Sequence, residues 1–186
     1  MAILVVYLGK FDREHIFPAF TPNEEAGAMP EFESIGIIHS PFRDPSNMPI
    51  QPGGKSSARG YADIHPAYAE GLKDLEGFSH LILLYHFHRT TEVKLTVTPF
   101  LDQEPRGIFS TRAPTRPNPI GLSIVRLESI DACRLHFLNL DVLDGTPLLD
   151  IKPYVPAFDL QEGVRIGWLA PFTGEVGKAH SDDRFS

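Results

Sequence analysis

The sequence predicts a mainly β protein in which one β-barrel-like mixed sheet is accompanied by one or two short helices. Seven or eight short apolar or alternating segments, separated by turns rich in proline and glycine, are typical of such barrels. The best helical window, residues 67–75, is short. No Gly-x-Gly-x-x-Gly follows a predicted strand, which argues against a Rossmann-type fold. With 186 residues and 42% apolar content, the chain has enough material for one domain with a genuine core.

Three regions follow one another along the chain. Residues 1–30 are predicted to form an N-terminal strand, 2–8, and a connector; residues 31–172 form the main domain, and residues 173–186 form a polar tail. The opening apolar stretch lacks a basic flank and is too short to span a membrane, so we expect a strand and not a signal peptide. We expect the protein to be cytoplasmic, because one cysteine, Cys133, permits no intramolecular disulfide.

The chain is expected to contain seven or eight short strands and one clear helix. Pro66 suits the first position of a helix that continues to Leu75. Residues 79–88 are almost continuously apolar, which is typical of a strand buried on both faces. Residues 131–133 fit a hairpin turn. The predicted strands are 33–39, 58–64, 79–88, 93–98, 120–130, 134–142, 148–154 and 164–169.

The rest of the chain is organised around Ser110–Gly121, which we call the proline–arginine segment. Its prolines and arginines are Pro114, Pro117, Pro119, Arg112 and Arg116. Each proline sets its own φ and restricts the residue before it, so the segment is stiff and cannot be a helix. Two guanidinium groups on a stiff loop suit a carboxylate, a phosphate or an aromatic face. The alternative is a rigid connector whose arginines lie in solvent.

Other polar residues have structural as well as functional interpretations. His86 and His88 form a His-x-His pair at a strand end, but no third ligand lies nearby in sequence, and we expect no metal. Asp144 is either a functional residue or an ordinary Asp-Gly turn residue. Lys152 is positioned to pair with Asp150 on one strand face. The net charge of −7 would repel nucleic acid, so an RNA partner would need a local basic patch or a second subunit.

Two longer motifs resemble the TsaA-like (YaeB/TrmO) family of S-adenosylmethionine-dependent tRNA methyltransferases. They are Phe109–Ser123 and Asp144–Tyr154, and the resemblance extends over roughly residues 33–158. It implies a barrel-like methyltransferase that forms a homodimer with the cofactor site near the interface. It also implies methylation of the exocyclic amine of a threonylcarbamoyl-modified adenosine beside the tRNA anticodon. The chain departs from longer members because it ends about thirty residues after Tyr154 and has about thirty extra residues before Glu31.

The resemblance also implies which residues bind S-adenosylmethionine. Arg112 would suit the cofactor's carboxylate, Leu122 and Pro52 would sandwich the adenine, and the backbone after Asp144 would read polar edges. The proline–arginine segment needs a partner surface for its apolar side, which agrees with a homodimer. The complete set carried over from the family is Ile50, Gln51, Pro52, Arg89, Thr90, Arg112, Leu122, Asp144, Gly145 and Thr146.

Methyl transfer to an adenine amine needs a nearby proton acceptor, and Asp144 and His86 are the two candidates. Arg106 and Arg116 are candidates for contacts with RNA phosphates. Arg116 has an alternative role in bracing its loop by pairing with Asp102 or Glu104. Three alternative functions remain open: binding of S-adenosylmethionine without methyl transfer, methyl transfer to another small amine, and a purely structural or partner-binding barrel.

Overall fold

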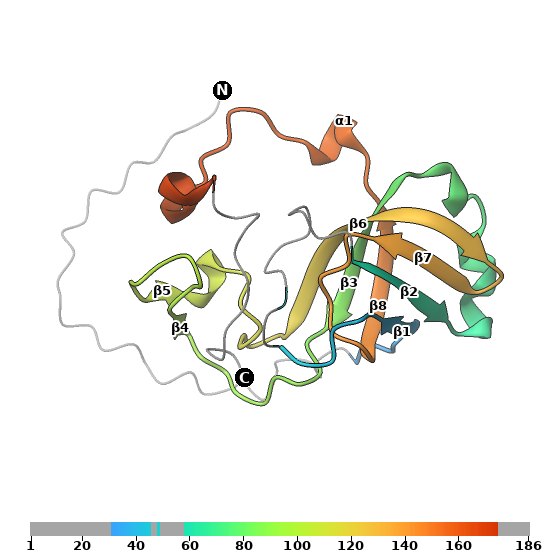
Figure 1. The fold of residues 1–186 in the computed structure, drawn as a ribbon, viewed down its shortest axis with the longest axis horizontal. Coiled ribbons are helices and arrows are strands. Elements are labelled where there is room, and N and C mark those ends of the chain that lie inside the picture. Colours follow the sequence, from blue (N-terminus) through green and yellow to red (C-terminus); the bar gives the residue numbers. More distant parts are fainter. Residues whose placement is uncertain (1–30, 46–47, 49–57, 175–186) are drawn as a thin grey trace, which may run out of the picture. The chain divides into compact units, whose positions relative to one another are not determined.

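Six strands close into a barrel (Figure 1) in this structure, a computed structural model that describes residues 31–45, 48 and 58–174. The residues from Phe32 onward belong to one compact unit of the chain. Every neighbouring pair in the barrel, in the order β1-β2-β7-β6-β3-β8, is antiparallel. The predicted barrel is therefore confirmed, with an antiparallel sheet in place of a mixed one. The strands are β1 (Gly36–His39), β2 (Arg59–Ile64), β3 (His80–His86), β6 (Ile120–Asp131), β7 (Arg134–Leu138) and β8 (Thr146–Pro153).

Short elements surround the barrel. A two-stranded sheet pairs β4 (Thr96–Val97) with β5 (Arg106–Gly107). One helical turn, α1 (Pro156–Asp159), follows β8. The 3₁₀ helices are η1 (Pro66–Leu72), η2 (Leu75–Gly77), η3 (Ile108–Ser110) and η4 (Gly167–Phe172). Residues 2–8 and most of the predicted polar tail, 175–186, lie outside the described residues.

The barrel interior is built by alternation along its strands. In β6 the side chains of Ser123 and Val125 point inward and are fully buried, while the intervening residues are exposed. This period of two is what a pleated strand with one interior face requires. Apolar side chains from all six strands and the loop after β7 make up the core: Ile38, Ala62, Ile64, Leu81, Leu83, Tyr85, Val125, Leu135, Phe137, Leu140, Val142 and Leu148.

Several predicted strands agree with the structure, and two require correction. The strand predicted at 79–88 is β3, His80–His86, but it is not buried on both faces: Leu81 and Leu83 are fully buried, whereas the outward Ile82 and Leu84 are half-buried. In a closed barrel only one face of a strand reaches the interior. The strand predicted at 93–98 shrinks to Thr96–Val97. The predicted pair between Lys152 and Asp150 is present, with Nζ 2.7 Å from the carboxylate oxygen.

Two further segments differ from the prediction. The helix begins at Pro66 as predicted, but it is 3₁₀ and is interrupted before η2, where Asp74 has a φ of 64°. Residues 164–169 do not form a strand; Val164 and Ile166 are exposed, and η4 begins at Gly167, whose φ is 56°. Because β1 pairs with β8, the barrel has no free edge to which this segment could add.

Candidate functional site

A large cavity lies against one side of the barrel. Its volume is about 1120 Å³. Typical pockets for a single drug-sized ligand measure about 300–1,000 Å³, so this cavity has room for more than one small group. Its lining residues come from seven parts of the chain: Pro45 and Met48 before β2, and residues within 85–90 at the end of β3, 99–101, 109–116, 118–122, 141–146 after β7, and 168–169 in η4.

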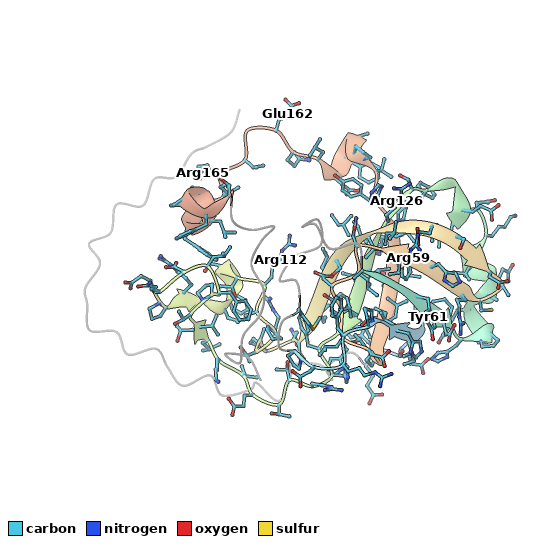
Figure 2. All side chains as sticks on the ribbon, viewed as in Figure 1. Arg59, Tyr61, Arg112, Arg126, Glu162 and Arg165 are labelled. Carbon is cyan, nitrogen blue, oxygen red and sulfur yellow. The ribbon has the colours of Figure 1, made fainter. Side chains whose placement is uncertain are left out.

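The proline–arginine segment forms a wall of this cavity and is not a connector in solvent. Its backbone is held from both sides: Phe87 N donates to the carbonyl of Pro119 at 2.8 Å, and Lys94 N donates to that of Thr115 at 2.9 Å. Arg116 Nη1 donates to the carbonyl oxygens of Thr111 and Ala113. These bonds hold the segment in place beside the barrel, and Arg112 lines the cavity (Figure 2).

Gly121, which ends the segment, is required by the tyrosine opposite it on β3. Tyr85 pairs with Gly121 in the register of β3 and β6. A Cβ atom at position 121 would overlap the Tyr85 ring, so only glycine lets the ring occupy this place. The ring carries its hydroxyl to 3.0 Å from Ser123 Oγ.

A buried polar chain starts from that tyrosine and reaches the cavity. Ser123 Oγ donates a hydrogen bond of 2.6 Å to Asp141 Oδ1. Because serine has one hydrogen to donate, the Tyr85 hydroxyl must donate to Ser123. The chain of donors therefore runs from Tyr85 through Ser123 to Asp141, and its last member lines the cavity.

Burial controls the ionisation of this chain. It raises the pKa of the Asp141 carboxyl to about 6, against the opposing effects of the Ser123 hydrogen bond and the charge of Arg112. Burial, followed by the negative charge of Asp141, also raises the pKa of the Tyr85 hydroxyl. The tyrosine therefore stays protonated at neutral pH, while the aspartate can exchange a proton.

His88 is a second basic group at the cavity. Its ring Nδ1 lies 3.3 Å from Thr146 Oγ1. Burial lowers the pKa of His88, and the charges of Arg89 and His86 lower it further, so the imidazole is neutral at pH 7.

The structure brings together half of the predicted cofactor residues. Arg89, Thr90, Arg112, Leu122 and Thr146 all line the cavity. Gly145 does not line it; its backbone N–H donates to the Ile38 carbonyl. Ile50, Gln51 and Pro52 lie outside the described residues.

Neither predicted proton acceptor lines the cavity. The Asp144 carboxylate instead accepts hydrogen bonds from the backbone N–H of Ser40 and from His39 Nδ1, each at 3.2 Å. Although burial acts in the opposite direction, these bonds lower the pKa of Asp144. His86 is the last residue of β3, and its side chain is not part of the lining. The residues predicted from sequence did not include Asp141. It could have been found as the one acidic residue in the largely apolar stretch from Leu138 to Leu143.

The two arginines predicted to contact RNA both have intramolecular partners. Arg106 Nε donates to Asp102 Oδ2 at 2.7 Å. Arg116 does brace its loop, as the alternative proposed, but through carbonyl oxygens and not through Asp102 or Glu104.

In the part of the chain that the structure describes, no group of three metal-ligating side chains gathers. No helix among these residues has the length and apolar character needed to cross a membrane.

A family model described as the tRNA-methyltransferase O N-terminal domain matches residues 37–160. The chain belongs to the TrmO family. The family predicted from the two sequence motifs is thereby confirmed. The match covers five of the six barrel strands completely and most of β1, together with the whole proline–arginine segment.

Proteins from several organisms resemble this chain. A Pyrococcus abyssi protein named as a probable S-adenosyl-L-methionine-binding protein is 52% identical over 154 residues, which is 83% of this chain and 84% of the relative. The Escherichia coli tRNA (adenine(37)-N6)-methyltransferase is 43% identical over 68% of this chain and 58% of the relative. The crystal structure of TrmO from Pseudomonas aeruginosa is 40% identical, with a TM-score of 0.65 over 76% of this chain and 63% of that one.

The chain therefore spans less than two thirds of the E. coli enzyme and of the P. aeruginosa structure, but most of the P. abyssi protein. The shared part contains the barrel, because the family model ends at residue 160, shortly after β8.

Proposed function

We propose that the protein binds S-adenosylmethionine in the cavity and transfers its methyl group to the exocyclic amine of an adenosine beside the anticodon of a tRNA. Membership of a family of tRNA methyltransferases supports this class of activity. The observation that carries the proposal is the cavity itself. The proline–arginine segment forms one of its walls, and Arg112 is one of the residues that line it. We place this activity in the cytoplasm, where such a tRNA would be met.

The residues of the cavity fit the chemistry of S-adenosylmethionine. Arg112 offers a planar guanidinium, which matches the cofactor's carboxylate with two parallel hydrogen bonds. Apolar side chains such as Leu122, Ile120 and Phe87 offer a surface for the adenine. When bound, the cofactor supplies a methyl group on a positively charged sulfur. The protein's contribution is to orient that group toward the acceptor and to exclude water.

The size of the cavity favours a second occupant beside the cofactor. Pockets for one small molecule measure about 300–1,000 Å³, and this one, at about 1120 Å³, lies slightly above that range. An extruded nucleoside is such an occupant, because enzymes that modify a base take it out of its stack. We propose a threonylcarbamoyl-modified adenosine as the natural acceptor, with another small amine as the alternative.

Contacts of Arg106 and Arg116 with RNA phosphates remain part of the proposal. They would use N–H groups other than those that already bond within the loop.

A specific observation favours a second candidate function. The P. abyssi relative is named only for binding S-adenosylmethionine, so a binding module without methyl transfer is the rival. One measurement tests cofactor binding, which both candidates require, and a second separates them. Cofactor at a hundredfold excess over its dissociation constant should stabilise the fold by about 2.7 kcal/mol under both. Incorporation of labelled methyl groups into tRNA from cells lacking the modification is expected only of the enzyme. A melting temperature indifferent to the cofactor would exclude both and leave a structural barrel.

Replacing Arg112 by alanine should weaken cofactor binding by about 1.5–3 kcal/mol, the scale of a charge-assisted hydrogen bond. Arg112→Lys should recover only part of this loss, because an ammonium cannot reproduce the two-pronged contact. Isothermal titration of each variant with S-adenosylmethionine measures the effect. Arg126→Ala is the matched control, since Arg126 is exposed on β6 and does not line the cavity (Figure 2). Equal affinities in all four proteins would move the carboxylate contact elsewhere, with Arg89 as the next candidate.

We also propose that the protein is a homodimer. The outward side chains of Ile120, Leu122 and Ile124 form an apolar stripe on β6, each about two fifths exposed. Two of them also line the cavity, so a second copy placed on the stripe would cover the cavity's edge. Light scattering at micromolar concentration should therefore give twice the mass of the chain, and Ile124→Glu should give the mass of one chain. Val164→Glu, at an exposed aliphatic residue outside the stripe, should stay dimeric. A monomeric wild type would end this proposal.

A further inference from the structure

Methyl transfer to an adenine-type amine leaves one proton to be removed, and this requirement points to a particular residue. The amine nitrogen uses its electron pair to form the new N–C bond, and the electrons of the broken S–C bond return to the sulfur. The nitrogen must then lose its proton, and its electron pair is too delocalised to attack well until that proton begins to leave. A positioned base with a pKa near the working pH accelerates such a step by about 10²–10⁴-fold.

Asp141 is the one carboxylate among the described residues that line the cavity. The other ionisable side chains in this lining are Tyr85, His88 and three arginines, Arg89, Arg112 and Arg116. Arginine cannot accept a proton at neutral pH, and Tyr85 is protonated and donates its hydrogen inward. Asp141 and His88 are therefore the two possible bases.

We propose that Asp141 is the catalytic residue that accepts the proton of the substrate amine, and that Ser123 and Tyr85 are positioning residues for its carboxylate. This inference rests on the proposed function. The Ser123 hydroxyl holds Oδ1 at 2.6 Å, which fixes the direction in which the rest of the carboxylate faces. Ser123 is itself fully buried and held by Tyr85, so the arrangement is set before any substrate arrives.

The proline–arginine segment contributes to the same arrangement. Gly121 leaves room for the Tyr85 ring, and the ring packs edge-on against Phe87 with their centroids 5.5 Å apart. The Asp141 carboxylate is thus positioned by the stiff segment together with Gly121 and with Tyr85 on the neighbouring strand. This packing explains why a glycine, Gly121, follows the prolines of the segment.

Charged and titratable groups from each neighbouring element act on Asp141. They are Arg112 from the proline–arginine segment, Tyr85 from β3 and the Ser123 hydroxyl from β6. His88, just beyond β3, lines the same cavity. Burial outweighs the stabilising effect of Arg112 and Ser123 and leaves the pKa of Asp141 at about 6. Most molecules then hold an ionised carboxylate at pH 7, which is ready to take a proton and basic enough to keep it through the transfer.

The test compares Asp141→Asn with the wild type in single-turnover methylation of tRNA. The variant should transfer the methyl group about 10²–10⁴ times more slowly, while its dissociation constant for S-adenosylmethionine changes less than about threefold. Asp150→Asn, at an exposed carboxylate on β8 that pairs with Lys152, is the control and should match the wild type. Tyr85→Phe and Ser123→Ala should each reduce the rate and move the lower limb of its pH profile, because they loosen the carboxylate without removing it.

A second readout needs neither cofactor nor tRNA. Carbon NMR of the free protein, labelled at aspartate carboxyls, should show one carboxyl that titrates near pH 6 and is absent from Asp141→Asn. Should the asparagine variant fail to fold, as judged by its melting curve, Asp141→Ser provides the same comparison.

Four results would overturn the inference. If Asp141→Asn transfers the methyl group at the wild-type rate, Asp141 is not the base. The same conclusion follows if His88→Gln slows the transfer more than Asp141→Asn does. Loss of cofactor affinity in Asp141→Asn would make Asp141 a cofactor ligand. Absence of a carboxyl titrating near pH 6 would contradict its proposed ionisation. A wild type that methylates no tRNA would instead overturn the proposed function, and this inference with it, so the two failures can be told apart.

Discussion

Replacing Phe137 by alanine should lower the free energy of unfolding by about 3–5 kcal/mol, the range for removing a buried aromatic side chain. Phe137 lies on β7, has no exposed surface and is the largest fully buried side chain among the residues that the structure describes. Its neighbours come from several barrel strands, so they cannot all move in to fill the space. Since domains are stable by only about 5–15 kcal/mol, this one change would remove a large share of the total. Urea unfolding followed by circular dichroism measures the difference.

Phe109→Ala is the matched control for this experiment. Phe109 is 78% exposed in η3 at the cavity. Its removal should change the free energy of unfolding by no more than about 0.5 kcal/mol, as is usual at the surface. Similar losses from the two substitutions would mean that the barrel interior is not the source of stability.

Asp141→Asn should become more stable relative to the wild type as the pH rises from 4 to 7, by about 2.5 kcal/mol. In the folded protein the pKa of Asp141 is about 6, compared with 3.8 for an ordinary aspartate. The folded state therefore holds the proton to a higher pH than the unfolded chain, and ionisation of the buried carboxyl favours unfolding. This loss of stability grows between pH 4 and 6 and is complete above that range. Its size follows from the difference of about two units between the folded and unfolded pKa, each unit being worth about 1.36 kcal/mol. Asparagine does not ionise and escapes the penalty.

The measurement is the difference in unfolding free energy between variant and wild type at pH 4 and at pH 7, which cancels the other titrating groups. Asp102→Asn provides a control of opposite sign. The hydrogen bond from Arg106 lowers the pKa of Asp102, so the stability from that pair is present at neutral pH and is lost as the pH falls below 3.8. Asp102→Asn should therefore lower the free energy of unfolding more at pH 7 than at pH 3. A constant difference for Asp141→Asn would show that its carboxyl ionises as it does in water.

Much of the fold could be read from local patterns. The alternation of β6, the turn at 131–133 and the start of η1 at Pro66 are all short-range features, and each is where the sequence placed it. The prediction failed at 164–169, where apolar residues suggested a strand. A strand needs an edge with which to pair, and whether an edge remains free depends on how the whole barrel closes.

The candidate site shows the same division. Residues 109–123 contain enough local information to indicate a stiff, cationic segment and the TrmO family, because prolines restrict the backbone wherever they stand. That Gly121 makes room for Tyr85 depends on the register of β3 with β6, two strands more than thirty positions apart in sequence.

By itself, the amino-acid sequence determined the family, the barrel class and the stiffness of the segment beside the cavity. Only the tertiary structure decided which of two aspartates, Asp141 or Asp144, lines that cavity. Asp141 and Asp144 lie three positions apart in the loop between β7 and β8. An odd spacing places two side chains on opposite sides of an extended chain, but it does not say which of them faces the cavity. The Asp141 carboxylate turns toward Ser123 and the cavity, while that of Asp144 turns toward His39 and Ser40, because the way this loop lies on the closed barrel sets the two directions.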